Sequence, residues 1–382
     1  MGRCLVCGEV LYEEPLLEFD HMPASAQDIP DLSSVEQDCG ISLALYQCQG
    51  CGLVQFDCEP VAYYRDVIRS GGYSTTMAAL RKKQYAHFIE TYHLQGKKFI
   101  EVGCGQGEFL SVLSEFPVMA YGVEHKHELV QKARNIGLCV EDGFLDNRQQ
   151  RLENGPFDAF LSFNFLEHQP DPNGMLQGIC QNLTAEGMGL ITVPSLEYIL
   201  EHNGYYELIR DHLAYYTFDT LRFVLQKNGF EVLEQEIVNR DTLSMIVRKK
   251  QRIDVEKIKA SYQSVCQELN QYTDSLKKAG KRVAIWGASH QGFTLAATAG
   301  LAGQVEYMID SAPFKQNRFA PASHIPIISP EEAQNRPTDA IIIMAPGYTK
   351  EIAGVIREKF DSETEIMVMK TRSLQRYEDI SS

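Results

Sequence analysis

The segment from Lys98 to Leu113 constrains the fold of this chain more than any other. A short apolar strand, Lys98–Val102, runs directly into a glycine loop at residues 103–107, and a helical stretch, Glu108–Leu113, follows the loop. Glycines at such a bend let a nucleotide-type ligand approach the backbone at the N-terminus of a helix. This order of strand, glycine loop and helix predicts an α/β domain with a Rossmann-like sheet.

Two acidic residues indicate which ligand the loop binds. Glu101 precedes the first glycine by two positions, and Glu124 ends the next predicted strand, residues 120–124. The first carboxylate can hold the loop and face an amino-acid group, whereas the second suits two ribose hydroxyls. This pair is common in class I methyltransferases and unusual in dehydrogenases. We therefore expect S-adenosylmethionine as the ligand, with a nicotinamide dinucleotide as the alternative.

Further cofactor contacts are expected at the ends of later strands. Asp142 is placed to bind the adenine amine, Phe144 is its apolar neighbour, and Asn164 follows the predicted strand Phe157–Phe163. Ligands of open α/β sheets bind beyond the carboxyl ends of the strands, which supports all three positions. The predicted cofactor site consists of Glu101, Gly103, Gly105, Gly107, Glu124, Asp142, Gly143, Phe144 and Asn164.

Two histidines near the same edge are the candidate catalytic groups. His168 lies in Phe165-Leu166-Glu167-His168, just beyond the strand Phe157–Phe163, and Asp211 precedes His212 shortly before the predicted helix 221–227. A histidine with a pKa near neutrality can remove a proton from a substrate. We expect His168, His212 and Asp211 to act on the methyl acceptor; a structural role is the alternative for both histidines.

Four of the ten cysteines form two identical Cys-x-x-Cys-Gly motifs, with Cys4 and Cys7 in the first and Cys48 and Cys51 in the second. Each tight turn directs two thiolates at one point, and two such pairs supply a closed tetrahedral site. We predict a structural Zn²⁺ ion bound by these four residues, with four unrelated buried cysteines as the alternative. The other six cysteines are expected to be buried as small apolar groups.

Composition restricts the partners and the location. The formal net charge of -15 argues against a nucleic-acid partner, because phosphate backbones are bound by clustered Lys and Arg. No apolar run of about 18 residues occurs, and the first residues lack the apolar core of a signal peptide. We expect a cytoplasmic protein with a small-molecule substrate and no membrane partner. The sequence leaves the oligomeric state open.

The C-terminal third repeats the pattern of strand, loop and helix. After an amphipathic helix at residues 255–276, a strand at 282–286 leads into a polar loop and an alanine-rich helix. This second unit is either kept for packing or binds a phosphate-bearing substrate. Its candidate contacts are Ser289, His290, Lys315 and Arg318. The predicted domains are a zinc-binding module (1–75), a Rossmann-like class I methyltransferase domain (76–250), and a linker helix with a C-terminal Rossmann-like α/β domain (251–382).

The chain resembles the bacterial C-methyltransferases that act on nucleotide-linked 4-keto-deoxyhexoses. The resemblance spans nearly the whole sequence. It rests on the paired cysteine motifs, the Glu-Val-Gly-Cys-Gly loop, the His168 segment, the Asp211-His212 pair, and a C-terminal set at 280–281, 287–288, Asp310, 315–318 and 324–327. It implies proton removal beside a keto group, formation of an enolate, and attack of that carbon on the donor methyl. Tyr73 lies near a tyrosine of the family and is a further candidate substrate contact.

Three other functions fit parts of the same pattern. O- or N-methylation of a sugar or related metabolite is the nearest, because it needs only a base for a hydroxyl or amine. A nucleotide-binding module without catalysis would bind the donor and turn nothing over. A dehydrogenase would bind a nicotinamide compound more tightly than S-adenosylhomocysteine.

Overall fold

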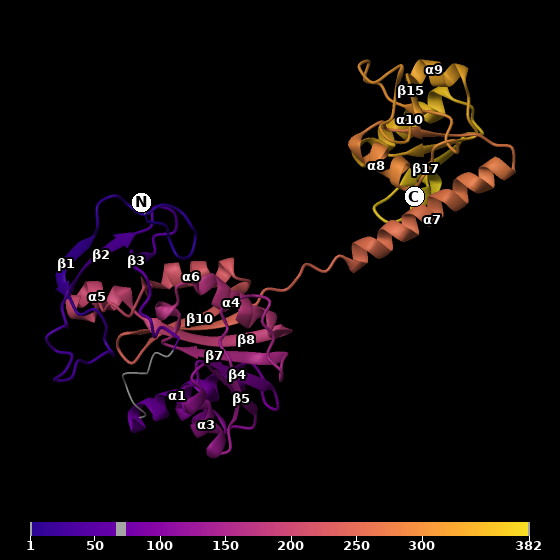
Figure 1. Ribbon diagram of the computed structural model, residues 1–382. Helices are drawn as coiled ribbons and strands as arrows, with labels where there is room; N and C mark the ends of the chain where they lie inside the picture. The colour runs from indigo at the N-terminus through magenta and orange to yellow at the C-terminus, as the bar shows by residue number, and fades with distance from the viewer. Residues whose placement is uncertain (1, 66–73, 381–382) are drawn as a thin grey trace. The chain divides into compact units, whose positions relative to one another are not determined.

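The computed structural model describes residues 2–65 and 74–380, which form two compact units, Met1–Arg252 and Ile253–Ser382 (Figure 1). The predicted α/β fold is confirmed, with a seven-stranded sheet in each unit. The residues assigned to the zinc-binding module and to the donor domain lie together in the first unit. The linker helix and the second α/β domain lie in the second unit. The predicted contact Tyr73 falls outside the described residues.

The main sheet of the first unit has the order β10-β11-β8-β7-β4-β5-β6. Its parallel strands are β4 (Lys98–Val102), β5 (Met119–Glu124), β6 (Cys139–Asp142), β7 (Phe157–Phe163) and β8 (Leu183–Pro194). At the other edge, β11 (Thr242–Lys249) runs antiparallel to β8, and β10 (Phe230–Val238) runs antiparallel to β11. Strands β5 and β6 lie on one side of β4, and strands β7 and β8 lie on the other, so the strand order reverses at β4. Such a reversal opens a crevice at the carboxyl ends of the strands, where ligands bind.

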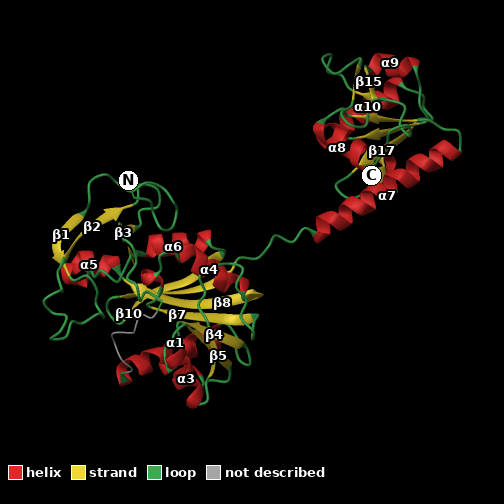
Figure 2. Ribbon diagram, in the orientation of Figure 1, coloured by secondary structure: helices red, strands yellow, loops and turns green. Residues whose placement is uncertain are grey.

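Helices cover both faces of this sheet (Figure 2). Helices α1 (Thr75–Thr91), α2 (Glu108–Leu113) and α3 (His127–Asn135) pack on one face, and α4 (Pro172–Gln181) and α6 (Phe218–Lys227) pack on the other. Each face has its own buried hydrophobic cluster. The short helices α5 (Leu196–His202), η1 (Leu166–His168) and η2 (Tyr205–Glu207) lie in the connections between strands. Buried on both faces, the sheet is a rigid platform for the loops at its ends.

The N-terminal segment forms a small antiparallel sheet with the order β1-β2-β3-β9. Three of its strands, β1 (Leu17–Met22), β2 (Ile41–Gln47) and β3 (Val54–Phe56), come from the predicted zinc-binding module. The fourth, β9 (Ala214–Tyr215), comes from the donor domain and pairs with β3. One sheet therefore joins the two regions that the sequence separates.

Side-chain packing strengthens this connection. Cys4 and Cys48 belong to the same buried cluster as Leu166 and Ala214 of the donor domain. The Asn173 side-chain amide also donates hydrogen bonds to the carbonyls of Leu5 and Val6, with distances of 3.1 and 2.9 Å. Burial shared across the boundary couples the stability of the N-terminal segment to that of the donor domain.

The second unit contains a sheet with the order β14-β15-β13-β12-β16-β17-β18. Its central strands are parallel, and the two edge strands β14 and β18 are antiparallel to their neighbours. The strands are β12 (Val283–Trp286), β13 (Met308–Ile309), β14 (Arg318–Phe319), β15 (Pro326–Ile328), β16 (Ala340–Ile343), β17 (Glu365–Met369) and β18 (Leu374–Arg376). The helices are α7 (Glu256–Lys278), α8 (His290–Thr298), α9 (Pro330–Asn335), η3 (Pro346–Tyr348), α10 (Thr349–Lys359) and α11 (Tyr377–Ile380).

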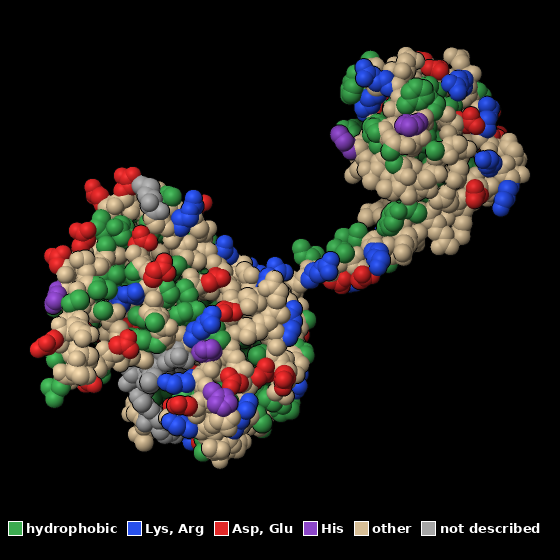
Figure 3. Space-filling model, viewed as in Figure 1, with side chains coloured by type: hydrophobic (Ala, Val, Ile, Leu, Met, Phe, Trp, Pro, Cys, Tyr) green, Lys and Arg blue, Asp and Glu red, His purple; other side chains and the backbone are tan. Residues whose placement is uncertain are grey.

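Helix α7 carries the predicted apolar stripe, but the stripe is covered only from Val265 onward. Val265, Leu269 and Leu276 are buried in the core of the second unit. Ile258 and Tyr262, one to two turns from the start of the helix, are exposed. Figure 3 shows hydrophobic side chains on the surface where α7 begins. The intrachain packing expected for this helix therefore applies from Val265 to its C-terminal end.

Two expectations about the remaining cysteines are wrong. Cys39 and Cys139 are exposed, because Cys39 lies in a loop and Cys139 begins the edge strand β6. Cys104 is buried, and the other three are half-buried. Among the residues that the structure describes, no helix is both long and apolar enough to cross a lipid bilayer.

Candidate active site

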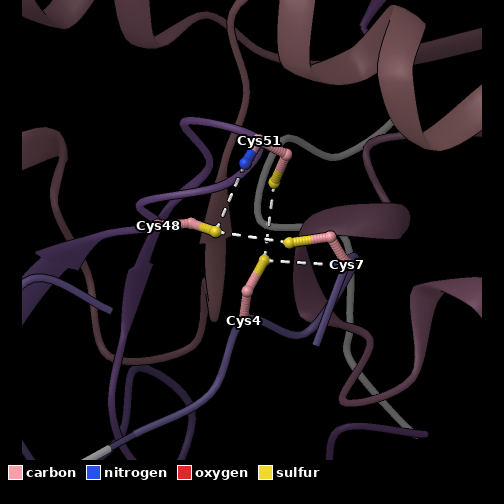
Figure 4. A group of neighbouring side chains, drawn as sticks. All are labelled: Cys4, Cys7, Cys48 and Cys51. Atoms are coloured by element: carbon pink, nitrogen blue, oxygen red, sulfur yellow. Dashed lines mark hydrogen bonds between the residues drawn. The ribbon is translucent and has the colours of Figure 1, made fainter. Parts of the chain in front are cut away.

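The four cysteines of the paired motifs converge on one point (Figure 4). The Sγ atoms of Cys4 and Cys51 are 3.6 Å apart, and those of Cys7 and Cys48 are 3.3 Å apart. A tetrahedral ion about 2.3 Å from each sulfur holds the sulfurs about 3.8 Å apart, close to this spacing. The predicted ligand set is thus brought together as a group that could hold a metal ion.

The surroundings of the sulfurs suit thiolates bound to a cation. Backbone N–H groups of Val6 and Cys7 point at the Cys4 sulfur, at 3.4 and 3.5 Å, and those of Gly50 and Cys51 point at the Cys48 sulfur in the same way. Desolvation by burial raises the pKa of the Cys4 thiol to about 11, although these N–H groups oppose the shift. A bound cation would ionise such thiols.

The glycine loop after β4 has the backbone geometry that its sequence predicts. Gly103, Gly105 and Gly107 have positive φ angles of 71°, 59° and 90°, a region that other residues enter at a cost. The carboxylate of Glu124 accepts hydrogen bonds from Gly105 N and from Lys126 N, both at 2.9 Å. Glu124 therefore holds the loop against the end of β5.

A cavity of about 970 Å³ opens beside this loop. That volume matches the larger of the pockets that bind small molecules and can hold a nucleoside donor together with part of an acceptor. Of the predicted site residues, those that line it are Gly103, Gly105, Glu124, Gly143, Phe144, Asn164, His168, Asp211 and His212. The structure thus unites most of the predicted cofactor and catalytic residues in one cavity of the first unit.

Three predicted cofactor residues lie outside the cavity lining. Glu101 is fully buried within β4, and Gly107 is the N-terminal cap of α2. The Asp142 carboxylate contacts the ring of His127, with 2.7 Å between Oδ2 and Nδ1. Asp142 is therefore engaged with α3, while Gly143 and Phe144 beside it face the cavity.

An apolar pocket for a base ring surrounds Phe144. Its ring packs edge-on against Phe165 and Tyr64, with centroid distances of 5.9 and 6.1 Å, and Leu129 and Leu145 line the same part of the cavity. Aromatic edges and aliphatic side chains suit a flat purine. Together with the glycine loop and Glu124, this pocket fits the nucleoside part of S-adenosylmethionine.

Arg81 of α1 is a cavity residue that the sequence does not reveal. It is buried, its guanidinium lies over the Phe163 ring at 3.7 Å from the centroid, and it donates a hydrogen bond to Gln84. A buried guanidinium that lines the cavity can bind a carboxylate such as the amino-acid end of the donor. Neighbouring Lys82 and Lys83 carry the same charge, so the sequence offers no signal that singles out Arg81.

His168, His212 and Glu167 meet at the other end of the cavity. The two imidazole rings are 4.7 Å apart, and Glu167 Oε1 is 4.0 Å from His168 Nε2. Burial lowers the pKa of His168 to about 4 and that of His212 well below its usual value, and it raises the pKa of Glu167 to about 8. Both imidazoles are therefore neutral near pH 7. The low pKa also makes His168 a weaker base than its sequence context suggests.

The N-terminal segment positions these groups. Leu213 N donates to the Glu167 carbonyl at 2.8 Å, and Phe56 N donates to the Leu213 carbonyl at 3.0 Å. Strand β9, which begins two residues after His212, continues this pairing with β3. Strand β3 starts three residues after Cys51 and pairs with β9. It therefore links the cysteine cluster to the histidine end of the cavity.

Asp211 acts through different partners from those predicted. Its carboxylate accepts hydrogen bonds from Ala26 N at 2.9 Å and from the Tyr63 hydroxyl at 2.7 Å, and its carbonyl accepts one from His168 Nδ1 at 2.9 Å. Asp211 lies in a hydrogen-bonded turn, and its carboxylate is bonded to these two groups rather than to the His212 ring. Tyr63 and Glu167 are functional candidates that sequence reasoning missed.

The predicted phosphate contacts all belong to the second unit. Ser289 caps α8 by accepting a hydrogen bond from Gly292 N, and Lys315 Nζ pairs with Asp310 Oδ2 at 2.9 Å. Ser289 and Asp310 follow the adjacent parallel strands β12 and β13, so both lie at the carboxyl edge of that sheet. His290 and Arg318 are exposed.

Replacing Gly103 with alanine tests the donor loop. Gly103→Ala and Gly96→Ala impose the same backbone strain, because their φ angles are 71° and 72°. Each should lose about 1–2 kcal/mol of stability. Only at Gly103 would the methyl group stand at the cavity wall, 3.5 Å from the Phe165 ring; at Gly96 it meets nothing within 4 Å. Calorimetric titration should show S-adenosylhomocysteine binding about tenfold or more weaker in Gly103→Ala alone. Equal affinity in both variants would contradict the assigned loop.

Comparison with known proteins gives matches along most of the chain. A methyltransferase domain model matches residues 77–235, and the C-methyltransferase C-terminal domain model matches residues 247–369. The C-methyltransferase NovU of Streptomyces niveus is 22% identical over 387 residues, covering 92% of this chain and 91% of NovU. A ubiquinone biosynthesis O-methyltransferase of Xylella fastidiosa is 30% identical over 116 residues, covering 28% of this chain and 46% of that protein.

Among solved structures, magnesium protoporphyrin IX methyltransferase of Synechocystis with bound S-adenosylhomocysteine is similar at 15% identity and a TM-score of 0.37, covering 49% of this chain and 93% of that one. The matched methyltransferase domain contains the glycine loop and Glu124. The protein is thus an S-adenosylmethionine-dependent methyltransferase. The second matched domain and the likeness to NovU along nearly the whole chain support a C-methyltransferase family.

Proposed function

We propose that the enzyme methylates C3 of a nucleotide-linked 4-keto-deoxyhexose through an enolate. The observation that carries this proposal is the end of the donor cavity where two buried, neutral imidazoles meet and Asp211 lines the same space. Methyl transfer to carbon needs groups that take a proton from C–H and stabilise the charge that moves to the keto oxygen. Transfer to a hydroxyl or amine, the second candidate, needs only a base.

The proposed methylation of C3 uses the groups at the histidine end of the cavity. A ketone acidifies the neighbouring C–H bond, so a group at the histidine end can accept the C3 proton while the bonding electrons move toward the keto oxygen. The resulting carbanion-like C3 forms the new C–C bond. When bound, S-adenosylmethionine supplies an electrophilic methyl on its sulfonium and leaves as S-adenosylhomocysteine. Placing both reactants in one enclosed cavity supplies much of the rate.

The remaining assignments belong to the same proposal. The glycine loop, Glu124, Phe144 and Asn164 hold the donor, and His168, His212 and Asp211 act on the acceptor. The four-cysteine cluster holds a structural Zn²⁺ ion, since four sulfur ligands leave no open coordination position. The acidic charge supports a small-molecule substrate without a nucleic-acid or membrane partner. The cytoplasmic location stays a prediction.

The second unit is proposed to bind a phosphate-bearing ligand. Ser289 and the Lys315–Asp310 pair lie at the carboxyl edge of its sheet, where phosphate groups bind in related folds. His290 and Arg318 are exposed and can add contacts to a diphosphate.

A labelled substrate separates methylation of carbon from methylation of oxygen or nitrogen. A nucleotide-linked 4-keto-deoxyhexose carrying deuterium at C3 should lose that label in every methylated product, because the C3–D bond must break before C3 can bond to methyl. Mass spectrometry of the product gives the result directly. The same sugar unlabelled, incubated in D₂O, is the control for exchange by solvent. A methylated product that keeps its deuterium would contradict the proposal and favour O-methylation.

A further inference from the structure

We propose that Glu167, His168 and His212 bind a divalent first-row transition-metal cation at the reaction end of the cavity, separate from the four-cysteine cluster. The role of this cation rests on the proposed function, whereas its binding can be measured without any substrate. Each of the three residues offers one ligand atom, and all three atoms lie within 4.8 Å of one another. The three residues also line the donor cavity, so a cation has access to the site.

The spacing of the ligand atoms is close to that of a metal site. An ion bound by nitrogen and oxygen at about 2.0–2.2 Å keeps its ligands at most about 4.4 Å apart. Glu167 Oε1 and His168 Nε2 are 4.0 Å apart, so small side-chain rotations bring all three atoms to one ion. Two imidazole nitrogens and one carboxylate are a ligand set that binds Mn²⁺, Fe²⁺, Co²⁺ or Zn²⁺ and leaves positions open.

Unsatisfied polar atoms point to a missing partner. Both carboxylate oxygens of Glu167 and Nδ1 of His212 are buried without a hydrogen-bond partner among the described residues. Glu167 is only 1% exposed, so bulk solvent hardly reaches its carboxylate. Leaving such groups buried and unpaired destabilises a protein. One cation would satisfy the carboxylate and coordinate the imidazoles together.

The backbone around the three ligands is already organised for this purpose. His168 Nδ1–H donates to the Asp211 carbonyl at 2.9 Å, which leaves Nε2 with its lone pair on the side of Glu167. Histidines that bind metals commonly donate their other ring N–H to a carbonyl in this way. The hydrogen bond from Leu213 N to the Glu167 carbonyl fixes the two segments to each other. The ligands therefore come from two chain segments held in register.

A cation here would stabilise the enolate. Bound to the keto oxygen through an open position, it would act as a Lewis acid for the negative charge that leaves C3. The C3 proton then passes to the Asp211 carboxylate, which lines the same cavity and accepts a hydrogen bond from Tyr63. The imidazoles serve as neutral ligands, the form in which histidine binds metals.

Manganese binding to the full-length protein tests the site. Mn²⁺ prefers oxygen and nitrogen ligands, whereas soft thiolates select Zn²⁺. The cysteine cluster should therefore bind no Mn²⁺ in this titration. Titration followed by electron paramagnetic resonance should give one Mn²⁺ per chain. Glu167→Gln and His212→Gln should each weaken the affinity for Mn²⁺ by at least about a hundredfold. His87→Gln, a change at an exposed histidine paired with Glu234, should leave it unaltered.

Pulsed resonance on the wild-type complex keeps the test decisive if a variant fails to fold. The bound Mn²⁺ should show hyperfine couplings from imidazole nitrogens. The absence of saturable binding, a signal without nitrogen couplings, or equal binding in folded Glu167→Gln would overturn the inference in favour of a proton shared between Glu167 and His168. Methylation of the keto sugar by enzyme that holds zinc in its cysteine cluster and no other metal would leave the proposed function intact and exclude the cation. Mn²⁺ binding without methylation of any keto sugar would support the cation site and contradict the proposed function.

Discussion

His168→Ala should lower methyl-transfer turnover by about a hundredfold or more while leaving the affinity for S-adenosylhomocysteine near normal. His168 lies at the acceptor end of the cavity, and its ring contacts Asp211 and His212 rather than the glycine loop. Its loss therefore removes a group that acts on the acceptor, whether as a ligand or as a base. Single-turnover methylation of a nucleotide-linked keto sugar measures the first quantity, and calorimetric titration measures the second.

His87→Ala is the matched control, because His87 is exposed on α1 and paired with Glu234 outside this cavity. It should keep wild-type turnover. Full activity in His168→Ala would exclude this residue from the mechanism. A parallel loss of donor affinity would instead show that the substitution distorts the whole cavity.

Cys48→Ser should release the metal, lower the melting temperature of the first unit and abolish methylation. A closed site of four cysteines contributes about 10–16 kcal/mol of binding free energy in small zinc-binding peptides, and such segments unfold without their metal. Here the effect extends further, because β3 begins close behind the second motif and pairs with β9. Elemental analysis, thermal unfolding and a methylation assay give the three results.

Cys39→Ser provides the control, since Cys39 is exposed in a loop outside the cluster. It should retain metal, stability and activity. Residual binding of S-adenosylhomocysteine in Cys48→Ser would locate the damage at the acceptor end, which the N-terminal sheet supports. A Cys48→Ser protein with one zinc per chain and full activity would contradict the role of this cluster.

Local patterns predicted the elements that depend on neighbours in sequence. Strand β4, helix α2 and strand β7 have the bounds expected from runs of apolar residues and from the glycine loop between β4 and α2. The cysteine motifs also converge as predicted: each Cys-x-x-Cys turn sets its own geometry within four residues, and the bridge between Leu11 and Cys48 brings the two turns together. At such places backbone preference and spacing alone specify the structure.

Contacts between distant segments cannot be predicted from these local patterns. Tyr63 and Asp211 are separated by 148 residues, and only the folded chain brings their side chains to 2.7 Å. In the sequence Glu167 is only a neighbour of His168, and its burial follows from packing against distant segments such as the one that contains Leu213. Asp142 shows the opposite outcome. Its position at a strand end predicts a ligand contact, but its carboxylate is hydrogen-bonded to His127 of α3.

By itself, the sequence determined the α/β class, the glycine loop between β4 and α2, and the two Cys-x-x-Cys turns, because each depends on the spacing of residues that are close along the chain. Only the tertiary structure decided that a strand of the N-terminal sheet supports His212, that Asp211 turns toward Tyr63, and that Glu167 joins two imidazoles in a buried cluster. Burial and long-range hydrogen bonds set these features, and both exist only after distant segments have packed together.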